Sequence, residues 1–178
     1  MNFLAVDPGL TSPAFHVFDF YTREIVDTPV LEMQATGFDR YVEVDEFVRH
    51  VLVTHECICL VIEGYGVSRF NPIPMVSIGH TIRFSAAVIG VPFIEIPPTS
   101  LKKFVTGSGK GSKKEKIMLE VYKRWGYEGT NDECDAFAVA MFFLAMFHEM
   151  DMPKVNLDAL PAVTISNERA LLLVNEMI

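Results

Sequence analysis

Four acidic side chains stand at the ends of apolar segments, where a carboxylate is better placed for chemistry than for packing. Asp7 follows Phe-Leu-Ala-Val and precedes a Pro-Gly turn, and Glu63 follows Leu-Val-Ile and precedes a glycine. Asp132 and Asp135 are three residues apart at the start of another apolar stretch, so a helix there would present both on one face. Carboxylate oxygens are the ligands that Mg²⁺ and Mn²⁺ prefer. These four acids are therefore our candidate metal ligands and catalytic residues.

Each of these acids also has an ordinary explanation. Aspartate is common before turns, glutamate can end a strand in solvent, and acids in the first turn of a helix favour its dipole. Their combination favours a metal site, because Asp7 and Glu63 meet at one sheet end if their strands are neighbours. Charges beside such apolar sequence also need a counter-charge, which divalent cations supply.

The elements that must position these acids follow from apolar periodicity and turn residues. We expect strands at 2–6, 14–20, 24–31, 57–62 and 91–96, and helices at 39–55, 74–89, 99–105, 112–125 and 131–149. The first three strands form an antiparallel meander, and the continuous apolar run of the fourth is typical of a central strand covered on both faces. This order predicts an α/β fold: a five-stranded mixed sheet flanked by helices.

Charge is segregated along the chain. The 178 residues carry a net charge of −8, but the segment 102–124 carries +6 and the remainder −14. Eight basic residues produce this: Lys102, Lys103, Lys110, Lys113, Lys114, Lys116, Lys123 and Arg124. The segment is either a ridge that contacts nucleic-acid phosphates or a solvated lysine-rich helix, and charge alone favours neither.

The motifs in order are FLAVDPGLTSPAF, CLVIEGYG, EIPPTSLKKFVTGSGKGSKKEKI and NDECDAFAVAM. Over residues 1–148 this set resembles the RuvC family of Holliday junction resolvases, especially its phage-type branch, within the ribonuclease H-like superfamily. The resemblance implies that Asp7, Glu63, Asp132 and Asp135 hold Mg²⁺, with Mn²⁺ able to substitute. It also implies a homodimer that nicks opposing strands of four-way DNA junctions, leaving 5′-phosphate and 3′-hydroxyl ends. We expect a nuclease domain over 1–150 and a C-terminal extension over 151–178 of unknown role.

Candidate DNA contacts lie in two segments. The glycine-rich loop 106–112 offers backbone amides and lysines to phosphates, and its spacing is not that of a P-loop. The candidates are Arg69, Phe70, Lys102, Lys103, Lys110, Lys113, Lys114 and Lys116. Phe70 and Arg69 could stack on a base or hold a phosphate, although Phe70 could equally pack on the core. The helix 74–89, rich in small residues, is a candidate dimer contact or a core-facing helix.

The remaining residues narrow the class of protein. Cys57, Cys59 and Cys134 lack metal-ligand spacing and are expected to be reduced core thiols, and no histidine has a ligand partner at a suitable spacing. The N-terminus lacks a signal peptide, and the most apolar stretch is shorter than a membrane span, so we expect a cytoplasmic protein, in the host cell if phage-encoded.

The sequence leaves three alternatives to a junction resolvase. A flap or RNA–DNA hybrid nuclease of the same fold would share the metal site. A catalytically inactive branched-DNA-binding protein would have no reason to gather four acids near phosphates. An ATPase of the same superfold would need phosphate-binding loops that the sequence does not contain.

Overall fold

The computed structural model describes residues 1–65, 73–108, 114–160, 164–165 and 172. The strands are β1 (Asn2–Asp7), β2 (Ala14–Asp19), β3 (Ile25–Asp27), β4 (Leu60–Glu63), β5 (Phe93–Ile96) and β6 (Thr164–Ile165). The helices are α1 (Asp39–Thr54), α2 (Ile73–Val88), α3 (Pro98–Thr106), α4 (Lys114–Trp125), α5 (Asn131–Ala145) and α6 (Lys154–Leu157). All five expected strands and all five expected helices are present, and α6 and β6 are additional.

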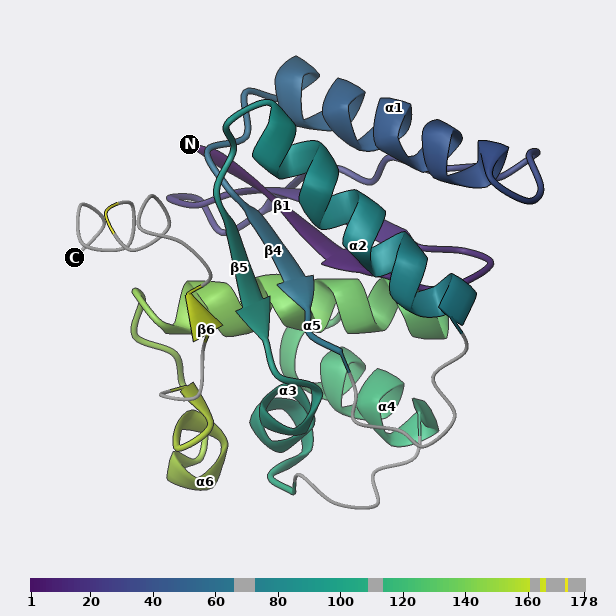
Figure 1. The fold of residues 1–178 in the computed structure, drawn as a ribbon. Helices are drawn as coiled ribbons and strands as arrows, with labels where there is room; N and C mark the ends of the chain where they lie inside the picture. The colour runs from purple at the N-terminus through teal and green to yellow at the C-terminus, as the bar shows by residue number, and fades with distance from the viewer. Residues whose placement is uncertain (66–72, 109–113, 161–163, 166–171, 173–178) are drawn as a thin grey trace.

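The strands form one mixed sheet in the order β3-β2-β1-β4-β5-β6 (Figure 1). The first three strands make the expected antiparallel meander, and β4 and β5 continue the sheet in parallel with β1. The short strand β6, from the C-terminal extension, pairs antiparallel with β5. The expected mixed sheet with flanking helices is thus confirmed.

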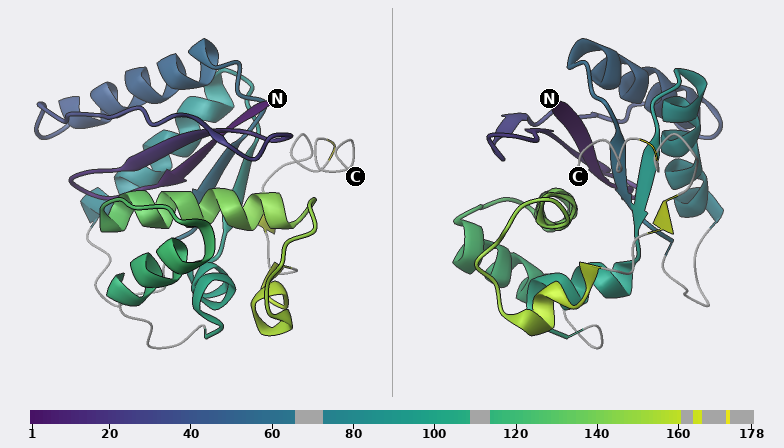
Figure 2. Two further views of the ribbon diagram at one scale, coloured as in Figure 1. Left: turned by 180° about the vertical axis from the view of Figure 1, so that it is seen from behind. Right: turned by 90° about the vertical axis from the view of Figure 1, so that its left-hand side faces the viewer.

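The sheet separates two apolar cores because strand side chains alternate between its faces. Phe3 and Ala5 of β1 pack on the face covered by α5, whereas Leu4 and Val6 pack on the face covered by α1 and α2. Figure 2 shows α5 on one side of the sheet and the α1–α2 pair on the other. The α5 face is rich in aromatic rings, such as Phe143, whose centroid lies 4.8 Å from that of Phe3.

Several elements are shorter than expected, for local reasons. Strand β3 ends at Asp27 instead of residue 31, and Pro29, which has no amide hydrogen for a ladder, stands in the part that drops out. Strand β4 begins at Leu60 because the amide of Cys57 still bonds the carbonyl of Leu52, at the end of α1. Helix α5 ends at Ala145 rather than at residue 149.

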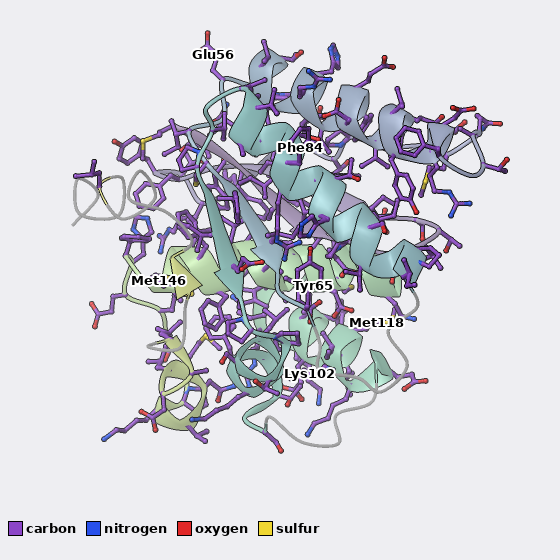
Figure 3. The ribbon with its side chains drawn as sticks, in the orientation of Figure 1. Glu56, Tyr65, Phe84, Lys102, Met118 and Met146 are labelled. Carbon is purple, nitrogen blue, oxygen red and sulfur yellow. The ribbon has the colours of Figure 1, made fainter. Side chains whose placement is uncertain are left out.

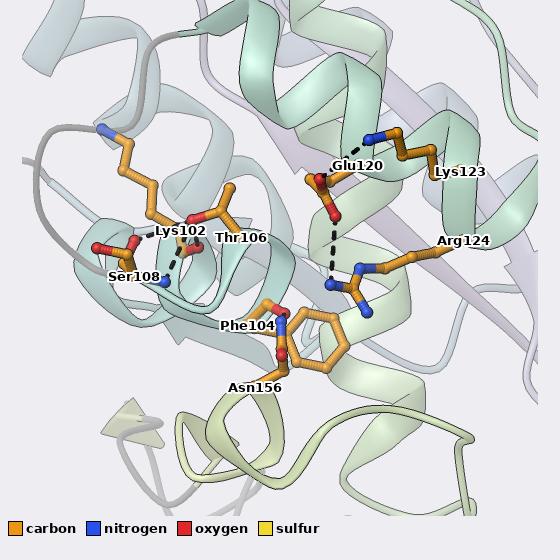
Figure 4. A network of polar contacts seen from close by, with 8 residues as sticks. All are labelled: Lys102, Phe104, Thr106, Ser108, Glu120, Lys123, Arg124 and Asn156. Atoms are coloured by element: carbon orange, nitrogen blue, oxygen red, sulfur yellow. Dashed lines mark hydrogen bonds and ion pairs between the residues drawn. The ribbon is translucent and has the colours of Figure 1, made fainter.

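The helix α6, from the described part of the C-terminal extension, packs on α3. Asn156 of α6 is buried, and its Nδ2 donates to the carbonyl oxygen of Phe104 at 2.6 Å (Figure 4). Lys103 Nζ donates to the carbonyl oxygen of Asp158 at 3.2 Å. Gly107, with φ of 73°, ends α3 in the left-handed conformation that favours glycine, and its amide bonds the carbonyl of Lys103. The extension therefore supports the helix that leads into the basic segment.

Within the parts of the chain that the structure describes, no helix has both the length and the apolar character needed to cross a bilayer.

Candidate functional site

Asp7 and Glu63 end two adjacent parallel strands. The β1–β4 pairing sets Val6 opposite Ile62, so the next pair along the same register is Asp7 and Glu63. Asp7 follows Phe3 and Ala5 at intervals of two, and Glu63 follows Cys59 and Val61 in the same way, all of which pack in the α5-side core. Strand alternation therefore directs both carboxylates to the α5 face. The sequence prediction that these acids meet at one sheet end depended on this pairing, and the pairing is observed.

Helix α5 brings the second pair of acids to the same region. Its start is fixed by a capping box, in which the Thr130 side chain accepts from the Glu133 amide and the Glu133 carboxylate accepts from the Thr130 amide. Asp132, in the first turn, accepts a hydrogen bond from Ser12 Oγ at 2.9 Å. Because Ser12 lies in the β1–β2 connection, just beyond Asp7, this bond ties the start of α5 to the end of β1. Asp135 lies in the second turn and is half-buried.

Contacts from β2 also support the first turn of α5. His16 of β2 is buried, and its Nε2 lies 3.0 Å from the Glu133 carbonyl oxygen and 3.2 Å from the Tyr127 hydroxyl oxygen. A carbonyl can only accept, so Nε2 is the protonated nitrogen. Burial lowers the pKa of His16, and burial raises that of Tyr127 to about 12, so both groups are neutral at physiological pH. The buried position of His16 is that of a structural histidine, as the sequence predicts.

The donor set suits a hard cation, although the acids do not form a closed cage. In the described part of the chain, no three His, Cys, Asp or Glu side chains cluster closely enough to hold a metal ion. Mg²⁺ is commonly bound by one or two carboxylates, with water and substrate phosphate completing its shell. The four acids at this end of the sheet therefore fit Mg²⁺ or Mn²⁺ by ligand chemistry, and the ligand roles of individual acids stay a prediction.

Cys134 directly precedes Asp135 on α5, so the state of the cysteine thiols bears on the metal chemistry of this region. All three cysteines are buried and free, as expected, and burial raises the pKa of Cys57 to about 12 and that of Cys134 in the same direction. Thiols held in the protonated form are poor metal ligands.

The structure describes only part of the candidate DNA-contact set. Lys102 and Lys103 lie on α3 and Lys116 on α4, with Lys116 exposed. Figure 3 shows Lys102 and Tyr65 at the end of the sheet where β4 terminates. Arg69, Phe70, Lys110 and Lys113 lie outside the described residues, as does the side chain of Lys114. Their DNA-binding roles stay predictions.

Two other basic residues of this segment are engaged within α4. Lys123 Nζ lies 3.8 Å from Glu120 Oε1, and Arg124 Nη2 lies 3.3 Å from Glu120 Oε2 (Figure 4). Glu120 is already counted in the net charge of +6, and these contacts place its negative charge beside Lys123 and Arg124.

Sequence reasoning missed an ion pair next to Glu63. Arg83 of α2 is buried and pairs with Glu95 of β5, and its Nη2 donates to the carbonyl oxygen of Glu63 at 3.1 Å. Both residues are lone charges in otherwise apolar segments, Ile-Arg-Phe and Phe-Ile-Glu-Ile. Opposite single charges of this kind in two core elements were the available signal.

Solved structures with a similar backbone define the fold class of this chain. The chain is similar to a solved structure of Thermus thermophilus RuvC, with a TM-score of 0.65 and 21% identity over 79% of this chain and 92% of that one. A T. thermophilus RuvC complex with a Holliday junction substrate gives a TM-score of 0.64. The fowlpox virus Holliday junction resolvase gives 0.56, with 14% identity over 82% of this chain and 99% of that one. The fold is therefore RuvC-like, which confirms the expected ribonuclease H-like fold.

Sequence comparison then gives particular relatives. The chain is 27% identical to the crossover junction endodeoxyribonuclease RuvC of Synechococcus sp., over 79% of this chain and 96% of the relative. It is 26% identical to the protein of that name from Gloeobacter violaceus, over 93% of this chain and 98% of the relative. No family model matches the chain.

Proposed function

We propose that this chain is a metal-dependent, structure-selective endonuclease that cuts Holliday junctions, and that it can also act on other branched DNA. The observation that supports this most is the pairing of β1 with β4, which sets Asp7 beside Glu63, together with the Ser12–Asp132 bond that brings α5 to the same end. The near full-length similarity to proteins named RuvC supports the same reaction.

The proposed reaction is hydrolysis of a phosphodiester. Mg²⁺, or Mn²⁺ in its place, held by Asp7, Glu63, Asp132 and Asp135, would activate a water and stabilise the leaving oxygen. Water adds to phosphorus and the bond to the 3′ oxygen breaks, so the products are a 5′-phosphate and a 3′-hydroxyl. The carboxylates are carried by two strand ends and a capped helix, and such rigid elements hold reacting groups in place. Ser12 contributes by orienting the Asp132 carboxylate.

Contact with the DNA backbone is assigned to the basic segment. Lys102 and Lys116 lie on α3 and α4, and the glycine-rich loop between these helices carries further lysines. Phosphate contacts of this kind supply affinity that falls with salt. Lys103 also donates to the extension, so its proposed role is shared between fold and DNA. Phe70 stands where the family resemblance places an aromatic that stacks at the junction, and Arg69 beside it is proposed to hold a phosphate.

The homodimer is proposed to form through α1 and α2. An apolar groove of about 650 Å³ lies between these helices, and its lining includes Phe38, Val42, Val76 and Phe84. Phe84, labelled on α2 in Figure 3, is 62% exposed. Exposed apolar patches of this kind typically mark protein interfaces. We also propose that residues 1–150 form the nuclease domain. The proposed location is the cytoplasm, which is that of the host cell if the protein is phage-encoded.

The test is cleavage of matched four-way junction, flap, RNA–DNA hybrid and linear duplex substrates, with Mg²⁺ or Mn²⁺. We expect paired nicks in the four-way junction. We also expect the mass of the protein–junction complex to correspond to two protein chains per junction. Preference for the flap or the hybrid would support the alternative nuclease of the same fold. Junction binding without cleavage under either cation would support the inactive DNA-binding protein.

A further inference from the structure

We propose that Arg83 is a positioning residue for the reaction, because it fixes the backbone at Glu63 and joins it to helix α2. The inference rests on the proposed function, in which Glu63 contributes a carboxylate. Arg83 does not touch substrate in this proposal. It acts through the chain segment on which Glu63 and the following residues are carried.

The guanidinium of Arg83 joins three elements at once. Its Nε–H donates to Glu95 of β5, its Nη2 to the Glu63 carbonyl oxygen of β4 at 3.1 Å, and its Nη1 to the Gly79 carbonyl oxygen of α2 at 2.7 Å. The side chain is only 6% exposed. Hydrogen bonds from a charged group away from water are stronger than neutral ones, so the carbonyl of Glu63 is firmly held.

The segment that leaves β4 is held by the same group. The Arg83 guanidinium carbon lies 4.3 Å from the centre of the Tyr65 ring, a cation–π contact. The Tyr65 hydroxyl lies 2.9 Å from His80 Nδ1, one turn earlier on α2. Glu63 is therefore bordered on its C-terminal side by a residue that α2 holds in two ways.

Gly79 makes room for this cluster. A Cβ at Gly79 would lie 3.0 Å from Arg83 Nη1 and 3.2 Å from Tyr65 Cε1. It would also lie 3.6 Å from Cβ of Pro8, the residue after Asp7. The close approach of α2 at this point places Arg83 against β4 where the strand ends, beside the turn that follows the other candidate ligand.

An arginine is required by this geometry. The planar guanidinium donates in three fixed directions, whereas the single ammonium of lysine cannot reach three acceptors on different elements together. Arg83→Lys retains the charge beside Glu95 and removes the fork. It therefore separates the positioning of Glu63 from the neutralisation of Glu95.

The experiment compares Arg83→Lys and Arg83→Met with Ile82→Ala. Ile82 is the preceding residue, fully buried in the core on the α1 side, so its truncation destabilises α2 without touching Glu63. Four quantities are measured at full folded fraction: the carbonyl ¹³C shift of Glu63 by NMR, junction binding without divalent cation, and kcat and KM for junction cleavage.

We expect both Arg83 variants to shift the Glu63 carbonyl resonance and to lower kcat about 10- to 100-fold, with binding and KM unchanged. Ile82→Ala should keep the parental resonance and kcat. An unmoved Glu63 resonance with parental kcat in Arg83→Lys would overturn the proposal, as would an equal loss of kcat in Ile82→Ala.

The experiment also covers a variant that does not fold and a parent protein that does not cut DNA. If Arg83→Met does not fold, Arg83→Lys decides, and Glu95→Gln, which keeps an acceptor oxygen, should give a smaller loss in the same direction. If the parent protein cuts no substrate, the proposed function has failed, and the Glu63 resonance alone then decides whether Arg83 holds that carbonyl.

Discussion

The acidic end of the sheet and the basic segment differ in how their charges are positioned. Asp7 and Glu63 are placed by the hydrogen-bonded ladder between β1 and β4, and α5 is anchored by its cap and by Ser12. The described basic residues of segment 102–124 lie on the short helices α3 and α4, and α6 bonds to α3. In the proposed function, catalysis, which needs fixed geometry, would therefore be carried by the ladder, whereas the proposed phosphate contacts, which tolerate displacement, would be carried by the basic segment.

The largest effect expected from this division is loss of cleavage without loss of binding. Asp7→Asn should lower junction cleavage by about 1000-fold or more, because the proposed function makes Asp7 a charged metal ligand. Junction binding, measured without divalent cation, should stay near that of the parent. Asp39→Asn, exposed at the start of α1, is the control. Equal nicking by Asp7→Asn and the parent would remove Asp7 from the site.

A second change tests the support of the basic segment. Asn156→Ala leaves the carbonyl of Phe104 without its partner in α6 and should lower the free energy of unfolding by about 1–3 kcal/mol. Urea unfolding measures this, with the exposed neighbour Val155→Ala as control. Junction affinity should fall while kcat at saturating DNA is retained. A loss confined to kcat would contradict the division between the two regions.

The third change addresses the lysines themselves. Lys110→Ala with Lys114→Ala should reduce the slope of log affinity against log salt by about 2, because the proposed function assigns one phosphate contact to each lysine. Lys123→Ala, at a position already paired with Glu120, should leave the slope unchanged. Filter binding at several salt concentrations provides the measurement. A parental slope in the double variant would assign both lysines to a solvated face.

The smallest effect concerns the support of α5. The pKa of His16 is lowered in the folded protein, mainly by burial, with Glu133 acting in the opposite direction. As pH falls below about 6.5, the unfolded chain therefore binds a proton that the folded protein does not, and stability decreases. Urea unfolding at pH 7.5 and 5.5 should show this decrease in the parent. His16→Phe should show less of it, whereas His50→Gln, at an exposed site, should retain it in full.

The sheet, with the two acids at the ends of β1 and β4, was also the part of the molecule that the sequence predicted well. Period-two and continuous apolar runs identified the strands of the sheet, and the position of Glu63 beside Asp7 followed once β1 and β4 were neighbours. The capping of α5 by Thr130 and Glu133 was readable in principle as a short local motif.

Contacts between distant segments were not predictable in this way. The Arg83–Glu95 pair depends on the packing of α2 against β5, and Asn156 bonds to Phe104, 52 residues away in the sequence. No local spacing in the sequence predicts either contact. A four-residue helix and a two-residue strand in the extension also carry too few residues to show periodicity.

The outer strands of the sheet have a consequence for self-assembly. A sheet ends in unpaired amides and carbonyls that can recruit a further strand from another molecule. Here β3 has three residues, with a register shift between Val17 and Phe18 in its pairing, and β6 has two. Such brief outer strands offer a poor template for fibril growth, so the molecule can expose an apolar groove on its helices without its sheet promoting aggregation.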